Sequence, residues 1–257
     1  MYSSMQHHAQ DSNARYTPGT YKRHNKNKRA RNSKMIFNSN NLTLPNTNQF
    51  VALDCEMVGV GPNGTKSSLA RVTIINFRGK VLMDEHIRQK QTVTDYRTFV
   101  SGITKEDLDE ATLTLERCRA KVLRLLHNKI LVGHALKNDL EVLGIDHPWW
   151  MIRDTATYQP FMKLRGGAYW PIKLKHLVKH YLEEDIQVYG QPHSPYEDAL
   201  AALNLYKHVQ TTWESKMQSQ VNQIYMDNLI EWEHYHQQVY QQQQYFVQQG
   251  YNRVPVQ

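Results

Sequence analysis

The chain has 257 residues, 40% of them apolar, and a formal net charge of +7. A chain of this length can bury one sizeable core, so we expect one main domain. No apolar run approaches the roughly 20 residues of a membrane-spanning helix, and the N-terminus lacks the apolar core of a secretion signal. The only cysteines, Cys55 and Cys118, are too few for a disulfide framework or a cysteine-rich zinc site. We therefore expect a soluble, intracellular protein without thiol chemistry.

All the net charge lies near the N-terminus. Residues 1–49 contain eight Lys or Arg residues and one acid, Asp11, whereas the remaining residues carry equal numbers of both signs. Residues 1–47 are polar and include the basic run KRHNKNKRARNSK at 22–34, so they are predicted to form a disordered tail. Such a run is typical of a nuclear-localisation signal or a nucleic-acid-binding arm, and a tail that only improves solubility is the alternative.

Three strands are predicted at the start of the domain. Their segments are 50–57 (FVALDCEM), 70–77 (ARVTIINF) and 81–87 (VLMDEHI). A turn is expected within 59–68 and another at 78–79. These short connections predict an antiparallel meander.

Helices and strands then alternate. The pattern predicts helices at 113–127, 136–145, 174–181 and 195 to about 213, with a short buried strand at 129–134 and a further segment, WWMIRDTATY, at 149–158. This order predicts an α/β domain with a mixed central sheet flanked by helices. Residues 216–257 are rich in Gln and Tyr and are predicted to be a helical or disordered extension.

The first strand carries two acids on one face. Asp54 and Glu56 are two residues apart, so their side chains point the same way, roughly 6 to 7 Å apart. Like charges at that distance repel by roughly 3 kcal/mol at an effective dielectric of about 20. A basic partner, a shared proton or a metal ion would relieve this repulsion; the alternative is that the strand end emerges into water.

A third acid lies in a predicted helix. Asp139 falls within the apolar stripe formed by Leu136, Leu140 and Leu143, which should face the sheet. A buried carboxylate costs several kcal/mol unless it is paired or binds a metal ion. The alternative is that Asp139 lies at the rim of the stripe and reaches water.

The last predicted helix begins at the motif HSPYEDA. Ser194 is a suitable N-cap, Pro195 suits the first helical position, and Glu197 completes a capping box. Asp198 has no capping role and lies on the face that packs inward. His193 stands on the loop just before the cap, five residues from Asp198.

Together these motifs resemble the DEDDh 3′-to-5′ exonucleases of the ribonuclease H-like fold. The resemblance is closest to the RNA exonuclease 4 family, relatives of the interferon-stimulated exonuclease, and is carried by the stretches VALDCEMVGVGPNG, ARVTIIN, VTDYRTFVSGIT, ILVGHALKNDLEVL, DHPWWMIRDTATYQPF and HSPYEDALAALNLY. It covers roughly residues 48–214. It implies a DnaQ-like exonuclease domain over residues 48–215.

The resemblance also implies a catalytic site. Asp54, Glu56, Asp139 and Asp198 would hold two Mg²⁺ or Mn²⁺ ions, hard cations that prefer carboxylate oxygens. Asp54 would bridge the two ions. Glu56 and Asp198 would complete the ligand shell of the first ion, and Asp139 would hold the second ion. His193 would be the general base, since an unperturbed histidine, with a pKa of about 6.5, can accept a proton from the attacking water.

Substrate contacts are less visible in the sequence. By the same resemblance, Met57, Val58, His134 and Asn138 are candidates for binding the terminal nucleotide, although Met57 could equally be core and Asn138 an ordinary helix-surface residue. The expected partner is nucleic acid, with RNA favoured and DNA possible. The expected setting is RNA processing in the nucleus or nucleolus, in particular of ribosomal RNA.

Two other classes of function are possible from the sequence, a dinucleotide-binding protein and a non-catalytic nucleic-acid-binding protein. The stretch GVGPNG at 59–64 fits the glycine pattern of a dinucleotide-binding loop, but a strand follows it where that loop requires a helix. A non-catalytic nucleic-acid-binding protein on the same fold is the stronger alternative. Such a protein would be expected to have lost a ligand, and all five catalytic residues are present.

Overall fold

The structure is a computed structural model that describes residues 44–227 and the single residues 241 and 248. The predicted basic tail therefore lies outside the described residues, except for its last four positions. The predicted extension at 216–257 is described as far as residue 227 and at the two single residues. Within the described part of the chain, no helix is long and apolar enough to cross a membrane.

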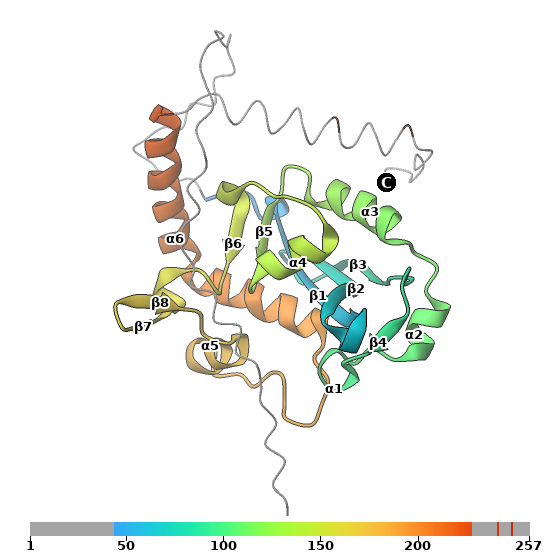
Figure 1. The fold of residues 1–257 in the computed structure, drawn as a ribbon. Helices are drawn as coiled ribbons and strands as arrows, with labels where there is room; N and C mark the ends of the chain where they lie inside the picture. The colour runs from blue at the N-terminus through green and yellow to red at the C-terminus, as the bar shows by residue number, and fades with distance from the viewer. Residues whose placement is uncertain (1–43, 228–240, 242–247, 249–257) are drawn as a thin grey trace, which may run out of the picture. The chain divides into compact units, whose positions relative to one another are not determined.

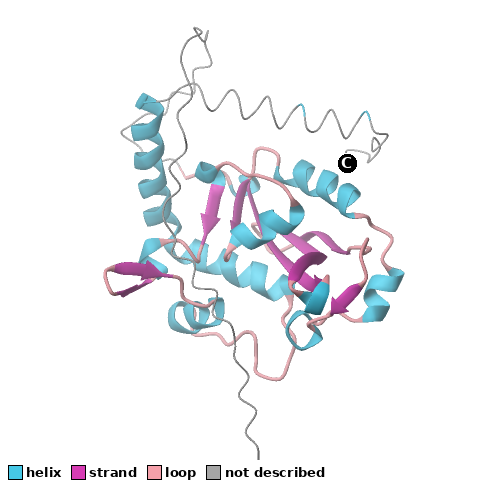
Figure 2. Cartoon of the chain, in the orientation of Figure 1, coloured by secondary structure: helices cyan, strands magenta, loops and turns pink. Residues whose placement is uncertain are grey.

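A mixed sheet with helices around it forms the domain (Figures 1 and 2). The strands are β1 (Phe50–Val60), β2 (Lys66–Asn76), β3 (Val81–His86), β4 (Val93–Asp95), β5 (Ile130–Gly133), β6 (Ile152–Asp154), β7 (Lys163–Arg165) and β8 (Ala168–Trp170). The helices are α1 (Thr98–Ser101), α2 (Lys105–Glu110), α3 (Leu115–Leu126), α4 (Leu136–Leu143), α5 (Leu174–Tyr181) and α6 (Pro195–Asp227).

The strand order is β3-β2-β1-β5-β6, and β4 pairs with the far end of β1. Strands β1 to β3 form the predicted antiparallel meander, while β5 and β6 run parallel to β1. The mixed sheet expected from the sequence is therefore confirmed. Strands β4, β6, β7 and β8 were not predicted, because each has only three residues and shows no alternating pattern.

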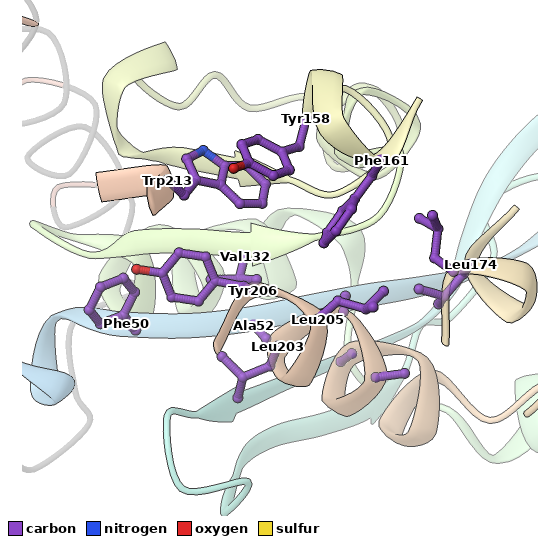
Figure 3. Packing of buried hydrophobic residues seen from close by; sticks show 14 of the residues in the cluster. Phe50, Ala52, Val132, Tyr158, Phe161, Leu174, Leu203, Leu205, Tyr206 and Trp213 are labelled. Carbon is purple, nitrogen blue, oxygen red and sulfur yellow. The ribbon is translucent and has the colours of Figure 1, made fainter. Parts of the chain in front are cut away.

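Alternate residues of β1 face two separate cores. Phe50 and Ala52 belong to the cluster that packs against α6, whose labelled members Leu203, Leu205 and Tyr206 lie across from them in Figure 3. Val51, Leu53 and Cys55 belong to the other cluster, which includes residues of α3 and α4. Asp54 and Glu56 continue the Phe50 and Ala52 series, so they point toward the side of the sheet that α6 covers.

Helix α6 continues well past the predicted end at about residue 213, to Asp227. The reason lies in tertiary contacts. Glu214 is buried and accepts two hydrogen bonds from Arg153, at 2.6 and 2.8 Å, and one from Tyr206 at 2.8 Å. Trp213 stacks on Tyr158 with ring centroids 3.9 Å apart. These contacts bind the middle of the helix to the domain, which the local sequence pattern alone does not report.

Candidate active site

Four carboxylates on three elements, β1, α4 and α6, lie close enough for their charges to interact. Asp54 lies at their centre: the pKa of Asp54 is raised well above its usual range, first by burial and then by the charges of Asp139, Asp198 and Glu56. Although part of the Asp54 surface stays accessible, protein atoms enclose its carboxyl group. The four acids that the sequence analysis grouped are therefore neighbours in space.

Glu56 is buried beside Asp54, and the pKa of Glu56 is raised to about 8, chiefly by burial and by the charge of Asp198. Arg71, its cross-strand neighbour, opposes this shift. However, Arg71 forms a bidentate ion pair with a different acid, Asp84, and both N–O distances are 2.8 Å. The nearby cation thus relieves the repulsion between the acids only in part.

Asp139 is fully inside the domain. Only 4% of its surface is exposed, so the alternative that it reaches water at the rim of α4 is wrong. Burial raises the pKa of Asp139 to about 7, against hydrogen bonds from the thiol and the backbone N–H of Cys55 that favour the charged form. The acid is held in a fixed place against β1.

Asp198 occupies the first turn of α6, next to His193. Its Oδ2 accepts a hydrogen bond from Gln187 Nε2 at 2.9 Å and lies 3.7 Å from His193 Nδ1. Burial is the main cause that raises the pKa of Asp198. As predicted, Ser194 caps the helix, accepting the Glu197 N–H at 3.3 Å, and the His193 N–H donates to Val100 O at 2.8 Å, which fixes the loop before the cap.

The donor set fits a hard cation. Asp198 Oδ1 is the one side-chain oxygen or nitrogen, among the described residues, that is buried without a hydrogen-bond partner. Buried polar atoms are nearly always satisfied, so a partner from outside the chain is expected there. No three His, Cys, Asp or Glu side chains in the described ranges already converge as a metal cluster.

A cavity of about 890 Å³ opens beside these acids. Asp54 and Asp139 line it, as do three of the four residues predicted to bind substrate, Met57, His134 and Asn138. Burial lowers the pKa of His134 to about 4, so this ring is neutral at physiological pH; its Nδ1 lies 2.9 Å from Thr155 Oγ1. It can therefore contact a nucleotide by hydrogen bonding or packing, but not as a cation.

Val58 is placed differently from the other three candidates. Its side chain is fully buried in a small cluster with Ala70, Ile103 and Leu108 and does not line the cavity. The strand register shifts between Glu56 and Met57 because β2 has an extra residue there, Ala70, whereas the side chains of β1 keep their alternation and Met57 packs on the same cluster as Leu53 and Cys55. The side chain of Val58 therefore lies away from the cavity, whereas Met57 lines it, and a substrate contact at either residue stays a prediction.

Asp154, which the sequence analysis did not select, organises one wall of the site. Its carboxylate accepts the backbone N–H groups of Ala135 at 2.7 Å, Leu136 at 3.0 Å and Ala156 at 2.9 Å. Ala135 has the unusual φ of 59° and offers no capping side chain to α4. The missing cap was the available signal: a helix that begins without Ser, Thr, Asp or Asn needs a donor partner from elsewhere.

Comparison with known proteins supports the assignment of these motifs. The RNase T exonuclease family matches residues 51–206. RNA exonuclease 4 of Mycosarcoma maydis is 44% identical over 171 residues, 66% of this chain and 45% of that protein. RNA exonuclease 4 of Saccharomyces cerevisiae is 43% identical over 166 residues, 65% of this chain and 56% of that protein. Interferon-stimulated 20 kDa exonuclease-like 2 of Homo sapiens is 44% identical over 173 residues, 66% of this chain and 48% of that protein.

Solved structures agree with the fold. The Neurospora crassa Pan2 catalytic unit, with protease and nuclease domains, matches with a TM-score of 0.55 and 28% identity over 71% of this chain and 30% of that one. The Saccharomyces cerevisiae Pan2 module in complex with AAUUAA RNA matches with a TM-score of 0.55 and 28% identity over 70% of this chain and 32% of that one. The predicted ribonuclease H-like fold is confirmed.

The chain spans about half the length of the curated relatives it matches. Exonucleases of this type use divalent metal ions, in agreement with the carboxylates described above. The resemblance to the RNA exonuclease 4 proteins is confirmed at 39 to 44% identity. The chain belongs to the RNase T exonuclease family.

Proposed function

We propose that this chain is a metal-dependent 3′-to-5′ exonuclease that hydrolyses the terminal phosphodiester of RNA and releases nucleoside 5′-monophosphates. The observation that carries the proposal is the group of four neighbouring carboxylates on β1, α4 and α6, in which Asp198 Oδ1 is buried without a partner. The membership of the exonuclease family supports the reaction type. The names of the curated relatives favour RNA over DNA as the substrate.

The carboxylates have distinct proposed roles. Asp54 would be a ligand of both of two Mg²⁺ or Mn²⁺ ions, Glu56 and Asp198 would be further ligands of the first ion, and Asp139 would hold the second ion. When bound, such ions supply positive charge that stabilises the attacking and leaving oxygens of an in-line displacement. The chain contributes the placement: Cys55 fixes Asp139 by hydrogen bonds, and Gln187 fixes Asp198.

His193 is the proposed general base. Its Nδ1 faces Asp198 Oδ2 at 3.7 Å, so a proton on Nδ1 would be stabilised there and the lone pair of Nε2 would be available. The side chain is 32% exposed, which leaves the ring accessible to water and substrate. Nε2 accepts the proton of the attacking water as the phosphodiester bond breaks.

The cellular setting forms part of the proposal. The basic run at 22–34 suits a nuclear or nucleolar protein and could add sequence-independent attraction to phosphates. Processing of ribosomal RNA is the role that we infer from the resemblance to RNA exonuclease 4. Comparing the salt dependence of RNA binding with and without residues 1–47 tests the tail, and equal slopes would reject its contribution.

A time course with matched 5′-labelled RNA and DNA oligomers tests the activity directly. With Mg²⁺ or Mn²⁺ we expect a descending ladder, faster on RNA, that EDTA abolishes. Loss of the ladder in Asp54→Ala, with an unchanged circular dichroism spectrum, would tie it to this site. Binding of RNA without any metal-dependent shortening would instead indicate a non-catalytic nucleic-acid-binding protein.

A further inference from the structure

The cavity beside the carboxylates continues along the sheet, well past them. In the β1–β2 register Asp54 pairs with Thr73, whereas Val60 pairs with Lys66. Six residues of strand separate Asp54 from Val60, or roughly 20 Å. Both Asp54 and the Val60–Lys66 pair line the same cavity, whose volume is about 890 Å³. That volume is near the upper end of the roughly 300 to 1,000 Å³ of pockets that enclose a small molecule.

Residues 87–91 line this cavity, and hydrogen bonds hold the backbone at the start of this segment. Ile87 is buried and its N–H donates to Ala70 O at 2.8 Å, while the Arg88 N–H donates to Leu113 O at 2.8 Å. The Gln89 amide donates to Leu69 O at 2.7 Å and to Ile87 O at 2.8 Å. Side chains that project from this segment therefore start from fixed backbone positions.

Basic side chains line this part of the cavity, and two of them have no acidic partner in the described part of the chain. Lys66, Arg88 and Lys90 line it, and Lys90 is engaged in an ion pair with Glu116. The side chains of Lys66 and Arg88 are exposed, and neither has a hydrogen-bond or ion-pair partner among residues 44–227. Lys66 and Arg88 are therefore two cations that line the same cavity as the carboxylates and have no partner among the described residues. Their positive charge complements the negative charge of a nucleic-acid backbone.

We propose that Lys66 and Arg88 form a phosphate-binding subsite, so that the cavity holds more of the nucleic-acid strand than the reacting phosphodiester. The guanidinium of Arg88 can donate two parallel hydrogen bonds to a phosphate. The ammonium of Lys66 adds a compact positive charge that attracts the same backbone. The identity of the bound strand as substrate rests on the proposed function. The subsite itself rests on the cavity, its register and its unpaired cations.

The chain provides a matched control at the other end of the same hairpin. Arg78 and Lys80 lie at the β2–β3 turn, their side chains are exposed, and neither lines the cavity. The double variants Lys66→Ala/Arg88→Ala and Arg78→Ala/Lys80→Ala remove the same total charge from the surface of the same two-stranded unit. Any difference between them reports position rather than net charge.

The experiment measures binding of a 5′-fluorescein single-stranded RNA 12-mer by fluorescence anisotropy, in Ca²⁺, from about 50 to about 300 mM salt. For Lys66→Ala/Arg88→Ala we expect the Kd to rise roughly tenfold or more at low salt. The slope of log K against log salt should become shallower by about 1.4, or about 0.7 for each lost phosphate contact on a single strand. The control variant should change the slope by less than half as much. Equal changes in both variants would overturn the subsite.

Two further measurements separate this inference from the proposed function. Thermal midpoints of both variants should match that of the unmodified chain, and a lower midpoint confined to Lys66→Ala/Arg88→Ala would instead assign these residues a structural role. Activity of the unmodified chain is measured in parallel. Absence of exonuclease activity together with the expected loss of binding would reject the proposed function and keep the subsite, whereas normal activity with unchanged binding would do the reverse.

Discussion

Gln187 holds one oxygen of Asp198 and leaves the other without a hydrogen-bond partner among the described residues. Gln187 Nε2 donates to Asp198 Oδ2 at 2.9 Å, while Asp198 Oδ1 is buried without a partner. Gln187 takes a positive φ of 52°, a conformation that costs a residue other than glycine about 1 kcal/mol or more. The surrounding loop maintains this geometry, which orients the carboxylate so that Oδ1 is free to bind a cation.

Removing the Gln187 amide should weaken metal binding without unfolding the chain. In Gln187→Ala, Asp198 loses its orienting donor, and we expect the Mn²⁺ concentration for half-maximal activity to rise about tenfold, as for other groups that orient a metal ligand. A metal titration of activity measures this. Gln191→Ala is the matched control, because Gln191 is exposed in the same loop and, among the described residues, forms a hydrogen bond only through its backbone N–H. Identical titrations for the two variants would contradict an orienting role.

Neutralising Asp198 should lower activity and raise metal-free stability. In Asp198→Asn the Gln187 hydrogen bond can persist, but the charge that raises the pKa of Glu56 and Asp54 is gone. We expect at least about a hundredfold loss of turnover, because a metal ligand is removed. In EDTA the thermal midpoint should rise, because a like-charge repulsion has been removed. Glu184→Gln, an exposed acid in the loop before α6, should change neither quantity. A midpoint that falls in EDTA would argue against repulsion at this site.

Metal-free stability should decrease as pH rises. Glu56 and Asp139 have pKa values raised to about 8 and about 7, so between about pH 4 and about pH 8 the folded chain binds more protons than the unfolded chain. Stability then falls as pH rises through this window, since unfolding releases bound protons. A bound divalent cation favours the charged carboxylates and should remove the dependence. Thermal midpoints from pH 5 to pH 8, in EDTA and in millimolar Mn²⁺, test this prediction; identical curves in the two conditions would count against it.

His193 should control how the rate depends on pH. A histidine base must be neutral to accept a proton, so the rate of the unmodified chain should rise with pH. His193→Ala should be slower by about 10² to 10⁴ and lose this rise, while metal binding persists. His176→Ala removes an exposed histidine on α5 and is the control. A normal pH profile in His193→Ala would place the base elsewhere.

The buried ion pair between α6 and β6 should be essential for stability. Glu214→Ala leaves the Arg153 guanidinium, which is 4% exposed, without its charge partner, and such a change typically costs about 3 to 5 kcal/mol. Asp185→Ala breaks the exposed pair with Lys179 and should cost less than about 1 kcal/mol. Urea unfolding of both variants gives the comparison. Similar losses would mean that Glu214 does not hold α6 in place.

Local patterns in the sequence were sufficient for the main elements and for the catalytic set. The alternation of FVALDCEM placed Asp54 and Glu56 on one face, and the spacing of Leu136 and Leu143 placed Asp139 inward, because strand and helix periods fix the direction of each side chain. Helix α5 was predicted with the bounds that the structure shows, Leu174–Tyr181.

Tertiary structure decided what no local period reports. Ile103 and Leu108, from a later part of the chain, cover Val58 in a small core, and contacts from Arg153, Tyr206 and Glu214 extended α6 beyond its predicted end. Asp154 and Gln187 hold the site through hydrogen bonds to other elements of the chain, which no local period reports. The sequence determined which acids share a face, because side-chain direction depends on neighbouring residues. Only the fold decided how those acids are held, because hydrogen bonds and burial depend on distant ones.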